Sequence, residues 1–223
     1  MTFSVVARCA DTGMFGVAVA SSSPAVAARC AHARAGVGAA ASQNITDPAL
    51  GPRALDLLAL GASAPQAMDV LRGGETMAFR QVLLVDAAGR TAVHSGAQAL
   101  GLWAEAQGGN VACGGNLLAS REVPGAMMAA FLAAPGDLGG RLLAAMRAGL
   151  DAGGEAGPVH SAGLCLVRDV PWPVADLRVD WTEDCPLAAL DALWTRYRPQ
   201  LDDYVTRALN PGGAPGYGVP GDP

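Results

Sequence analysis

The apolar and polar positions at the start of the chain predict a β-hairpin. An apolar run over residues 2–7 is followed by an Asp-Thr-Gly turn at 11–13 and by a second apolar run over residues 15–20. Runs of this length, bounded by turn residues, are typical of buried strands. Chain ends are usually frayed and exposed, so a first strand that begins at Thr2 would hold this residue unusually still.

The same patterns predict the other elements. We expect strands over residues 34–43, 81–86, 90–94, 111–116, 161–168 and 176–181, and helices over residues 53–60, 65–71, 121–133, 137–150 and 185–209. Pro199 is expected to kink or divide the last helix, and the Gly- and Pro-rich residues 210–223 are expected to form a tail without regular structure. This order of elements indicates an α+β or layered protein with one domain over residues 1–209.

Composition and charge exclude several classes of function. The net charge is -5, and the fifteen basic residues are scattered and all arginine, which disfavours nucleic-acid binding. Without lysine the chain has no P-loop, no Schiff-base amine and no Ser-Lys dyad. No apolar run reaches the length of a membrane span, and the first residues lack the basic and apolar regions of a signal peptide. We therefore expect a cytoplasmic protein without a membrane or nucleic-acid partner.

The cysteines and histidines indicate no metal site or cofactor. Five cysteines without a CxxC pair fit neither a disulfide framework nor a zinc site, and most are expected to be buried: Cys9, Cys30, Cys113, Cys165 and Cys185. Cys9 or Cys30 could be a nucleophile, but no base is evident near either thiol. His160 and Ser161 are a tempting pair, yet adjacent strand residues point to opposite faces.

Thr2 is the candidate nucleophile. A threonine at position 2 is small enough for the initiator methionine to be removed, which would leave a free α-amine beside the hydroxyl. Such an amine has a pKa of about 7.7–8.0 and can accept the hydroxyl proton near neutral pH. The alternative is that Thr2 is only the first residue of a strand, and if Met1 remains, Thr2 has no free base.

Polar residues at predicted strand ends could complete a site. Gln43 is the preferred oxyanion or substrate-orienting group, because its amide can donate hydrogen bonds. Arg80 and Gln81 begin a strand, and a guanidinium can bind a carboxylate through two hydrogen bonds. Asn116 follows two glycines, which allow close approach of a ligand to the backbone. Each of these residues could instead be an ordinary strand end, turn or surface residue.

Over nearly its whole length the chain resembles the bacterial and archaeal family known as domain of unknown function 1028. The stretches that carry the resemblance are TFSVVAR at 2–8, AGVGA at 35–39, SQ at 42–43, DPALGP at 47–52, RQ at 80–81, SG at 95–96, GNLL at 115–118 and DLRVD at 176–180. The sequence departs from the family pattern at Gly114, where a glutamine is usual, and over residues 24–28, where aromatic residues are usual.

The family is classed with the Ntn (N-terminal nucleophile) hydrolases. The resemblance implies a four-layer αββα sandwich of Ntn-hydrolase type, in which the first strand presents residue 1 or 2 at the open end of the central sheets. It also implies a reaction class, namely attack on a small amide, ureido or related carbonyl. It does not imply a particular substrate.

We therefore expect an Ntn-type amidohydrolase that cleaves a small amide or ureido substrate through Thr2. Gln43, Arg80, Gln81 and Asn116 are its candidate oxyanion or substrate contacts. The alternative is a catalytically silent domain of the same fold that binds a metabolite or forms an oligomeric scaffold. A homo-oligomer fits either function, because four apolar residues of the last helix form a stripe that could lie in an interface or in the core: Leu190, Leu193, Trp194 and Tyr197.

Overall fold

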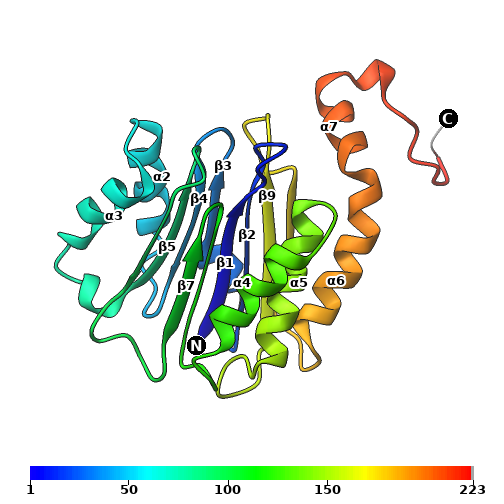
Figure 1. Ribbon diagram of the computed structural model, residues 1–223. Helices are drawn as coiled ribbons and strands as arrows, with labels where there is room; N and C mark the ends of the chain where they lie inside the picture. Colours follow the sequence, from blue (N-terminus) through cyan, green and yellow to red (C-terminus); the bar gives the residue numbers. More distant parts are fainter. Residues whose placement is uncertain (222–223) are drawn as a thin grey trace.

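Two antiparallel sheets, packed face to face, form the centre of the computed structural model, which describes residues 1–221 (Figure 1). The large sheet has the strand order β10-β9-β2-β1-β8-β7 and the small sheet the order β3-β4-β5-β6. The strands are β1 (Thr2–Arg8), β2 (Phe15–Ser21), β3 (Ala31–Arg34), β4 (Gly38–Gln43), β5 (Gln81–Asp86), β6 (Thr91–Ser95), β7 (Ala104–Gly108), β8 (Val111–Asn116), β9 (Ser161–Val167) and β10 (Ala175–Val179). The first strand therefore lies inside the large sheet, between β2 and β8.

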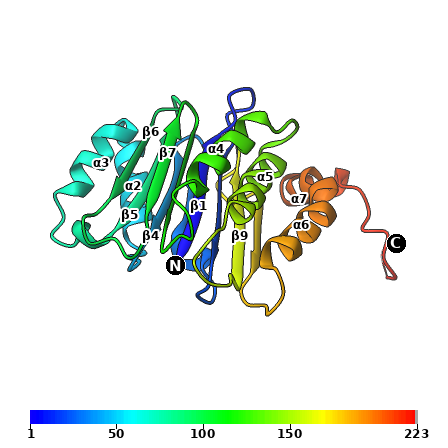
Figure 2. The same cartoon turned by 60° about the horizontal axis from the view of Figure 1, so that its bottom comes forward.

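Helices cover the outer face of each sheet. The α-helices are α1 (Ala27–Cys30), α2 (Leu50–Ala59), α3 (Ala64–Arg72), α4 (Val123–Ala133), α5 (Leu138–Asp151), α6 (Pro186–Tyr197) and α7 (Leu201–Leu209). Helices α2 and α3 pack on the small sheet, α4 and α5 pack on the large sheet, and α6 packs on β9 and β10 (Figures 1 and 2). The predicted α+β class is confirmed.

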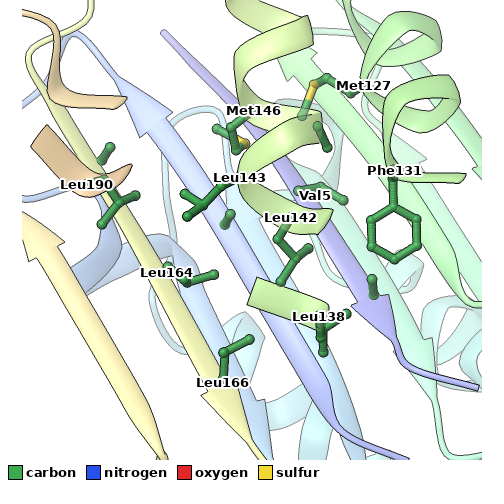
Figure 3. Packing of buried hydrophobic residues seen from close by; sticks show 14 of the residues in the cluster. Val5, Met127, Phe131, Leu138, Leu142, Leu143, Met146, Leu164, Leu166 and Leu190 are labelled. Atoms are coloured by element: carbon green, nitrogen blue, oxygen red, sulfur yellow. The ribbon is translucent and has the colours of Figure 1, made fainter. Parts of the chain in front are cut away.

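Successive residues of β1 face two different apolar cores. Val5 belongs to the core beneath α4 and α5, together with Met127 and Leu142 of those helices (Figure 3). Val6 belongs to the core between the sheets, together with Leu83 of β5. Because both of its faces are buried, β1 has a continuous apolar sequence rather than an alternating one.

Most predicted elements are present, with ends displaced by a few residues. The hairpin at the start of the chain is confirmed as β1 and β2, which pair from Phe3 with Ala20 to Arg8 with Phe15. The second predicted hairpin is confirmed as β5 and β6. As expected from Pro199, the last helix is divided: α6 ends at Tyr197, a 3-10 turn spans Arg198–Gln200, and α7 begins at Leu201.

The prediction of one strand over residues 34–43 is wrong. Gly36 has a φ of +71°, and the turn around it separates two paired strands, β3 and β4. Positive φ is readily adopted by glycine but not by most other residues. The stretch therefore forms a hairpin whose second strand begins only at Gly38.

Two further features differ from the prediction. The edge strand β7 was not predicted, because Ala104 to Gly108 contains no β-branched or aromatic residue. A 3-10 turn spans Pro211–Gly213, within the tail expected to lack regular structure; residues 222–223 of that tail lie outside the described residues.

The apolar stripe of α6 lies mainly against the rest of the chain. Leu190 and Trp194 are buried in the core beneath α4 and α5, and the Tyr197 hydroxyl donates to the Val174 carbonyl at 2.9 Å, whereas Leu193 is 39% exposed. Among the helices of residues 1–221, none is both long enough and apolar enough to cross a membrane.

Candidate functional site

Thr2 lies at the start of β1, near the edge of the interface between the sheets. Its residue is 5% exposed, and its cross-strand neighbour in β8 is Asn116. The Thr2 hydroxyl is 3.4 Å from Oγ of Ser21, at the end of β2. Both hydroxyls also donate hydrogen bonds to the carbonyl oxygen of Met1. The Met1 carbonyl is therefore bound directly beside the candidate nucleophile.

A serine cluster continues this polar row across the large sheet. Ser21 lies 2.8 Å, oxygen to oxygen, from Ser23 and accepts from the Ser23 backbone N–H at 3.1 Å. Ser161 of β9 is the cross-strand partner of Ser21 and donates to the Ser23 carbonyl at 2.6 Å. Since cross-strand partners share a face, the strand pairing places Ser21 and Ser161 on one side of the sheet. Neither serine is among the site residues predicted from the sequence.

Gln43, Gln81 and Asn116, all predicted site residues, form one buried network. Gln43 and Gln81 are paired across β4 and β5, and Gln43 Nε2 donates to Gln81 Oε1 at 2.7 Å. Asn116 Nδ2 donates to the same oxygen at 3.2 Å. Gln43 Oε1 in turn accepts from the Ser4 hydroxyl at 2.8 Å. The network joins the two sheets through Asn116 of β8 and Ser4 of β1, the strand that begins at Thr2.

The two glutamine amides use their hydrogens inside this network. Gln43 Nε2 also donates to the Gly114 carbonyl at 3.2 Å, and Gln81 Nε2 donates to Ser95 Oγ at 2.9 Å and to the Gly115 carbonyl at 3.1 Å. Both glutamines are fully buried. Asn116 Nδ2 donates one hydrogen to Gln81, and no second acceptor for it is found within residues 1–221. Of the three amides, the amide of Asn116 is the one with a hydrogen to spare.

Arg80 is not brought into this network. It precedes β5 with an extended backbone, so its side chain points to the face opposite that of Gln81. No hydrogen bond joins it to Thr2, Gln43 or Asn116 in the described part of the chain. Its Nε is buried and has no hydrogen-bonding partner among residues 1–221.

A buried carboxyl group, Glu155, lies beside the site. The residue is 4% exposed, and each of its carboxylate oxygens is 3.2 Å from the backbone N–H of Ser22. Burial raises the pKa of Glu155 to about 7, against the opposing effects of the N-terminal amino group, the hydrogen bond from Ser22 and the charge of His160. A carboxyl group with a strongly perturbed pKa is a feature of many active sites.

The position of Glu155 is fixed by backbone contacts with the segment after Asn116. Glu155 forms an isolated β-bridge with Leu118, the Ala119 N–H donates to the Gly154 carbonyl at 3.1 Å, and the Ala156 N–H donates to the Leu117 carbonyl at 2.9 Å. Gly153 and Gly154 both have positive φ. The glycine pair predicts a turn, but the sequence has no pattern that indicates that Glu155 approaches Ser22.

His160 and Ser161 do not form a catalytic pair. His160 Nδ1 lies 2.8 Å from the Thr182 carbonyl, and its ring stacks on Trp181 with a centroid separation of 4.4 Å. The Ser161 hydroxyl is bonded to Ser23 instead. Their partners lie in different segments, as strand alternation predicts.

The cysteines and acidic groups of residues 1–221 form no cluster that could hold a metal ion. Within residues 1–221 every cysteine is free, four of the five are buried as expected, and no group of three or more histidine, cysteine or acidic residues is placed to hold a metal ion. Burial raises the pKa of Cys30, so its thiol is poorly suited to attack.

A cavity of about 400 Å³ lies at the opposite end of β9, lined by residues that include Arg34, Val167 and Trp172.

Comparison with known proteins identifies the family. Residues 2–190 match the model of a family of unknown function, DUF1028. The chain belongs to this family. A crystal structure of a DUF1028 protein from Silicibacter pomeroyi is similar to this fold, with a TM-score of 0.84 and 28% sequence identity over 91% of this chain and 89% of that chain. Among curated proteins, none matches the chain. The resemblance to DUF1028 expected from the sequence is thus confirmed.

Proposed function

We propose that this DUF1028 protein is an Ntn-type amidohydrolase that cleaves a small amide or ureido substrate through Thr2 after removal of Met1. The observation that carries the proposal is the pair of hydrogen bonds from the Thr2 and Ser21 hydroxyls to the Met1 carbonyl oxygen. A site that already binds an acyl oxygen beside a hydroxyl nucleophile is suited to acyl transfer. The arrangement of two sheets between helices also supports an αββα sandwich of Ntn type.

In the proposed reaction the α-amine of Thr2 accepts the hydroxyl proton as Thr2 Oγ attacks the substrate carbonyl carbon. The carbonyl oxygen becomes an oxyanion, which the spare hydrogen of Asn116 Nδ2 and the Ser21 hydroxyl can stabilise. The proton then passes to the leaving nitrogen as the C–N bond breaks, which leaves an ester on Thr2. Water hydrolyses this ester and restores the hydroxyl.

Gln43 and Gln81 have a supporting role in this proposal. Both donate inside the buried network, and Gln81 Oε1 fixes the amide of Asn116. They are positioning residues, because rigid support keeps an oxyanion donor in its productive place. Arg80 has no part in the proposed reaction, since its side chain points to the opposite face.

One observation favours the alternative of a catalytically silent binding or scaffold domain. With Met1 in place, Thr2 is 5% exposed, and its nitrogen belongs to the peptide bond with Met1. A threonine in this state has no free amine to act as a base. Whether Met1 is removed therefore separates the two functions.

The decisive experiment combines the identity of the N-terminus with labelling. Untagged protein is analysed by N-terminal sequencing and intact mass, before and after incubation with a p-nitrophenyl ester as an acylating probe. We expect Thr2 as the first residue and one added acyl group, and no labelling of Thr2→Ala. Thr12→Ala, in the exposed turn between β1 and β2, is the matched control and should be labelled like the wild type. Retained Met1, or equal labelling of Thr2→Ala, would contradict the proposal.

A further inference from the structure

Glu155 is a buried carboxylate whose charge is poorly compensated. Its hydrogen bonds come from one backbone donor, Ser22 N–H, which the two carboxylate oxygens share. No arginine or histidine forms an ion pair with it among residues 1–221. Burying a charge without a partner is costly, so packing alone gives no reason for a carboxylate at this position. The group suited to this position is a cation or a group with several N–H donors, and in the structure the charge of the Met1 amino group acts on this carboxylate.

The loop that carries Glu155 borders the space occupied by Met1. Ser22, the hydrogen-bond donor to Glu155, directly follows Ser21, whose hydroxyl contacts the Met1 carbonyl. Two residues after Glu155, a Cβ atom added at Gly157 would lie 3.6 Å from Cε of Met1. Glu155 and Gly157 therefore lie on the side of the site where the body of Met1 is found.

Met1 itself indicates what this space accommodates. It is an aminoacyl group whose carbonyl is bound by the Thr2 and Ser21 hydroxyls. The positive charge of its amino group acts to lower the pKa of Glu155. An acyl ester on Thr2 Oγ is an isomer of an acyl amide on Thr2 N, because both atoms belong to the same residue. An acyl group transferred from substrate would thus lie where Met1 lies in the structure. Its α-amino group would then be on the side of Glu155.

We propose that the site takes α-aminoacyl amides and esters, and that Glu155 binds the α-ammonium group of the substrate. The inference rests on the proposed function and names its substrate class. In the reaction Thr2 forms an α-aminoacyl ester, the amine or alcohol leaves with the proton from the Thr2 hydroxyl, and water releases the amino acid. Glu155 takes no part in proton transfer and acts as a specificity-determining residue.

The first test compares two chromogenic substrates that differ only in the amino group, alanine p-nitroanilide and propionyl p-nitroanilide. The wild type should prefer the alanine substrate, and Glu155→Gln should lower that preference roughly 10- to 100-fold, as expected when a hydrogen bond to a charged group is lost. Glu183→Gln is the matched control: Glu183 lies near His160 but its side chain is 80% exposed, and its loss should leave the preference unchanged. Equal losses on both substrates in Glu155→Gln, or no preference in the wild type, would overturn the inference.

The second test does not depend on turnover. Thr2→Ala lacks the nucleophile but keeps a small second residue, so Met1 can still be removed, which intact mass verifies. Calorimetric titration of this protein should show that L-alaninamide binds and propionamide does not, and that adding Glu155→Gln abolishes the binding. Selective binding without activity in the wild type would contradict the proposed reaction alone. Activity without selectivity, or no binding of L-alaninamide, would overturn the ammonium site.

Discussion

Asn116 of the large sheet donates a 3.2 Å hydrogen bond through Nδ2 to Oε1 of Gln81 in the small sheet. Asn116 is also the cross-strand neighbour of Thr2. The position of the proposed oxyanion donor therefore depends on a residue of the opposite sheet. The same oxygen of Gln81 accepts from Gln43, so one side chain fixes two amides.

Replacing Gln81 with leucine should destabilise the protein and misplace Asn116. The change removes the acceptor of Gln43 Nε2 and Asn116 Nδ2 and leaves buried donors without partners, which should lower the free energy of unfolding by roughly 2–4 kcal/mol. Urea denaturation measures this change. Gln98→Leu, at an exposed position, is the control and should shift stability little. A Gln81→Leu protein as stable as the wild type would show that the network does not hold the sheets together.

Glu155→Gln should stabilise the protein at alkaline pH. The folded-state pKa of Glu155 is about 7, against an ordinary value of 4.5, so the folded protein binds the extra proton between these two pH values. Stability contributed by the protonated group is therefore lost as pH rises through this window, and the loss is complete above about pH 7. At pH 8 the glutamine variant should be more stable by up to about 3 kcal/mol, and near pH 4 the two proteins should be similar.

Urea denaturation at pH 4 and pH 8 measures this difference. The N-terminal amino group and His160 also act on Glu155, and both groups are unchanged in the Glu155→Gln variant. A Glu155→Gln protein that is less stable than the wild type at pH 8 would contradict the prediction. A gain in stability with a loss of substrate preference is typical of a residue retained for function.

The sequence predicts those strands whose signal is local. Strands β1 and β2 are apolar runs on either side of a turn, so they are identified without knowledge of their partners. Strand β7 has alternating small and polar residues, and its conformation comes from pairing with β8. The sequence does not distinguish β3 and the turn at Gly36 from β4, because the whole stretch is rich in alanine and glycine.

The candidate site likewise has residues that local sequence patterns predict and residues that they do not. Gln43, Gln81 and Asn116 each end or begin a strand, so their gathering could be anticipated from the strand pattern. Glu155 lies in a glycine turn, and its approach to Ser22 is a contact across more than a hundred residues of sequence, which no local pattern encodes. Arg80 is a different case, since alternation from Gln81 directs its side chain to the opposite face.

Ile45→Gly should stabilise the protein modestly. Ile45 has a φ of +46° and is 51% exposed. This β-branched residue therefore has a left-handed backbone conformation whose strain is not offset by burial of the side chain. Relief of about 1–2 kcal/mol of strain, set against the greater chain entropy of glycine, should raise the free energy of unfolding by about 0.5–1 kcal/mol. Leu60→Gly is the control: Leu60 is 86% exposed but has a φ of -78°, and its replacement should be destabilising.

Asp86→Asn should destabilise the protein at neutral pH, because it removes a carboxylate whose two oxygens both accept hydrogen bonds. Asp86, at the end of β5, is 3% exposed and accepts hydrogen bonds from the backbone N–H groups of Ala64, Ala88 and Arg90 at 2.8 to 3.0 Å and from Arg90 Nε at 2.7 Å. An asparagine keeps one acceptor oxygen and turns an NH₂ group toward donors. We expect a loss of roughly 3 kcal/mol in the free energy of unfolding.

The pH dependence of this loss provides a second check. Burial alone raises the pKa of Asp86, but the hydrogen bonds from Ala64, Arg90 and Ala88 outweigh it and lower the pKa below its ordinary value of 3.8. The stability contributed by the carboxylate is therefore present above about pH 4 and is lost as pH falls through the lowered folded-state value. The difference between wild type and Asp86→Asn, followed by urea denaturation, should thus shrink below pH 3. Asp56→Asn, which removes an exposed ion pair with Arg34, should cost less than about 1 kcal/mol; an equal cost for both variants would mean that burial and hydrogen bonding of Asp86 add nothing.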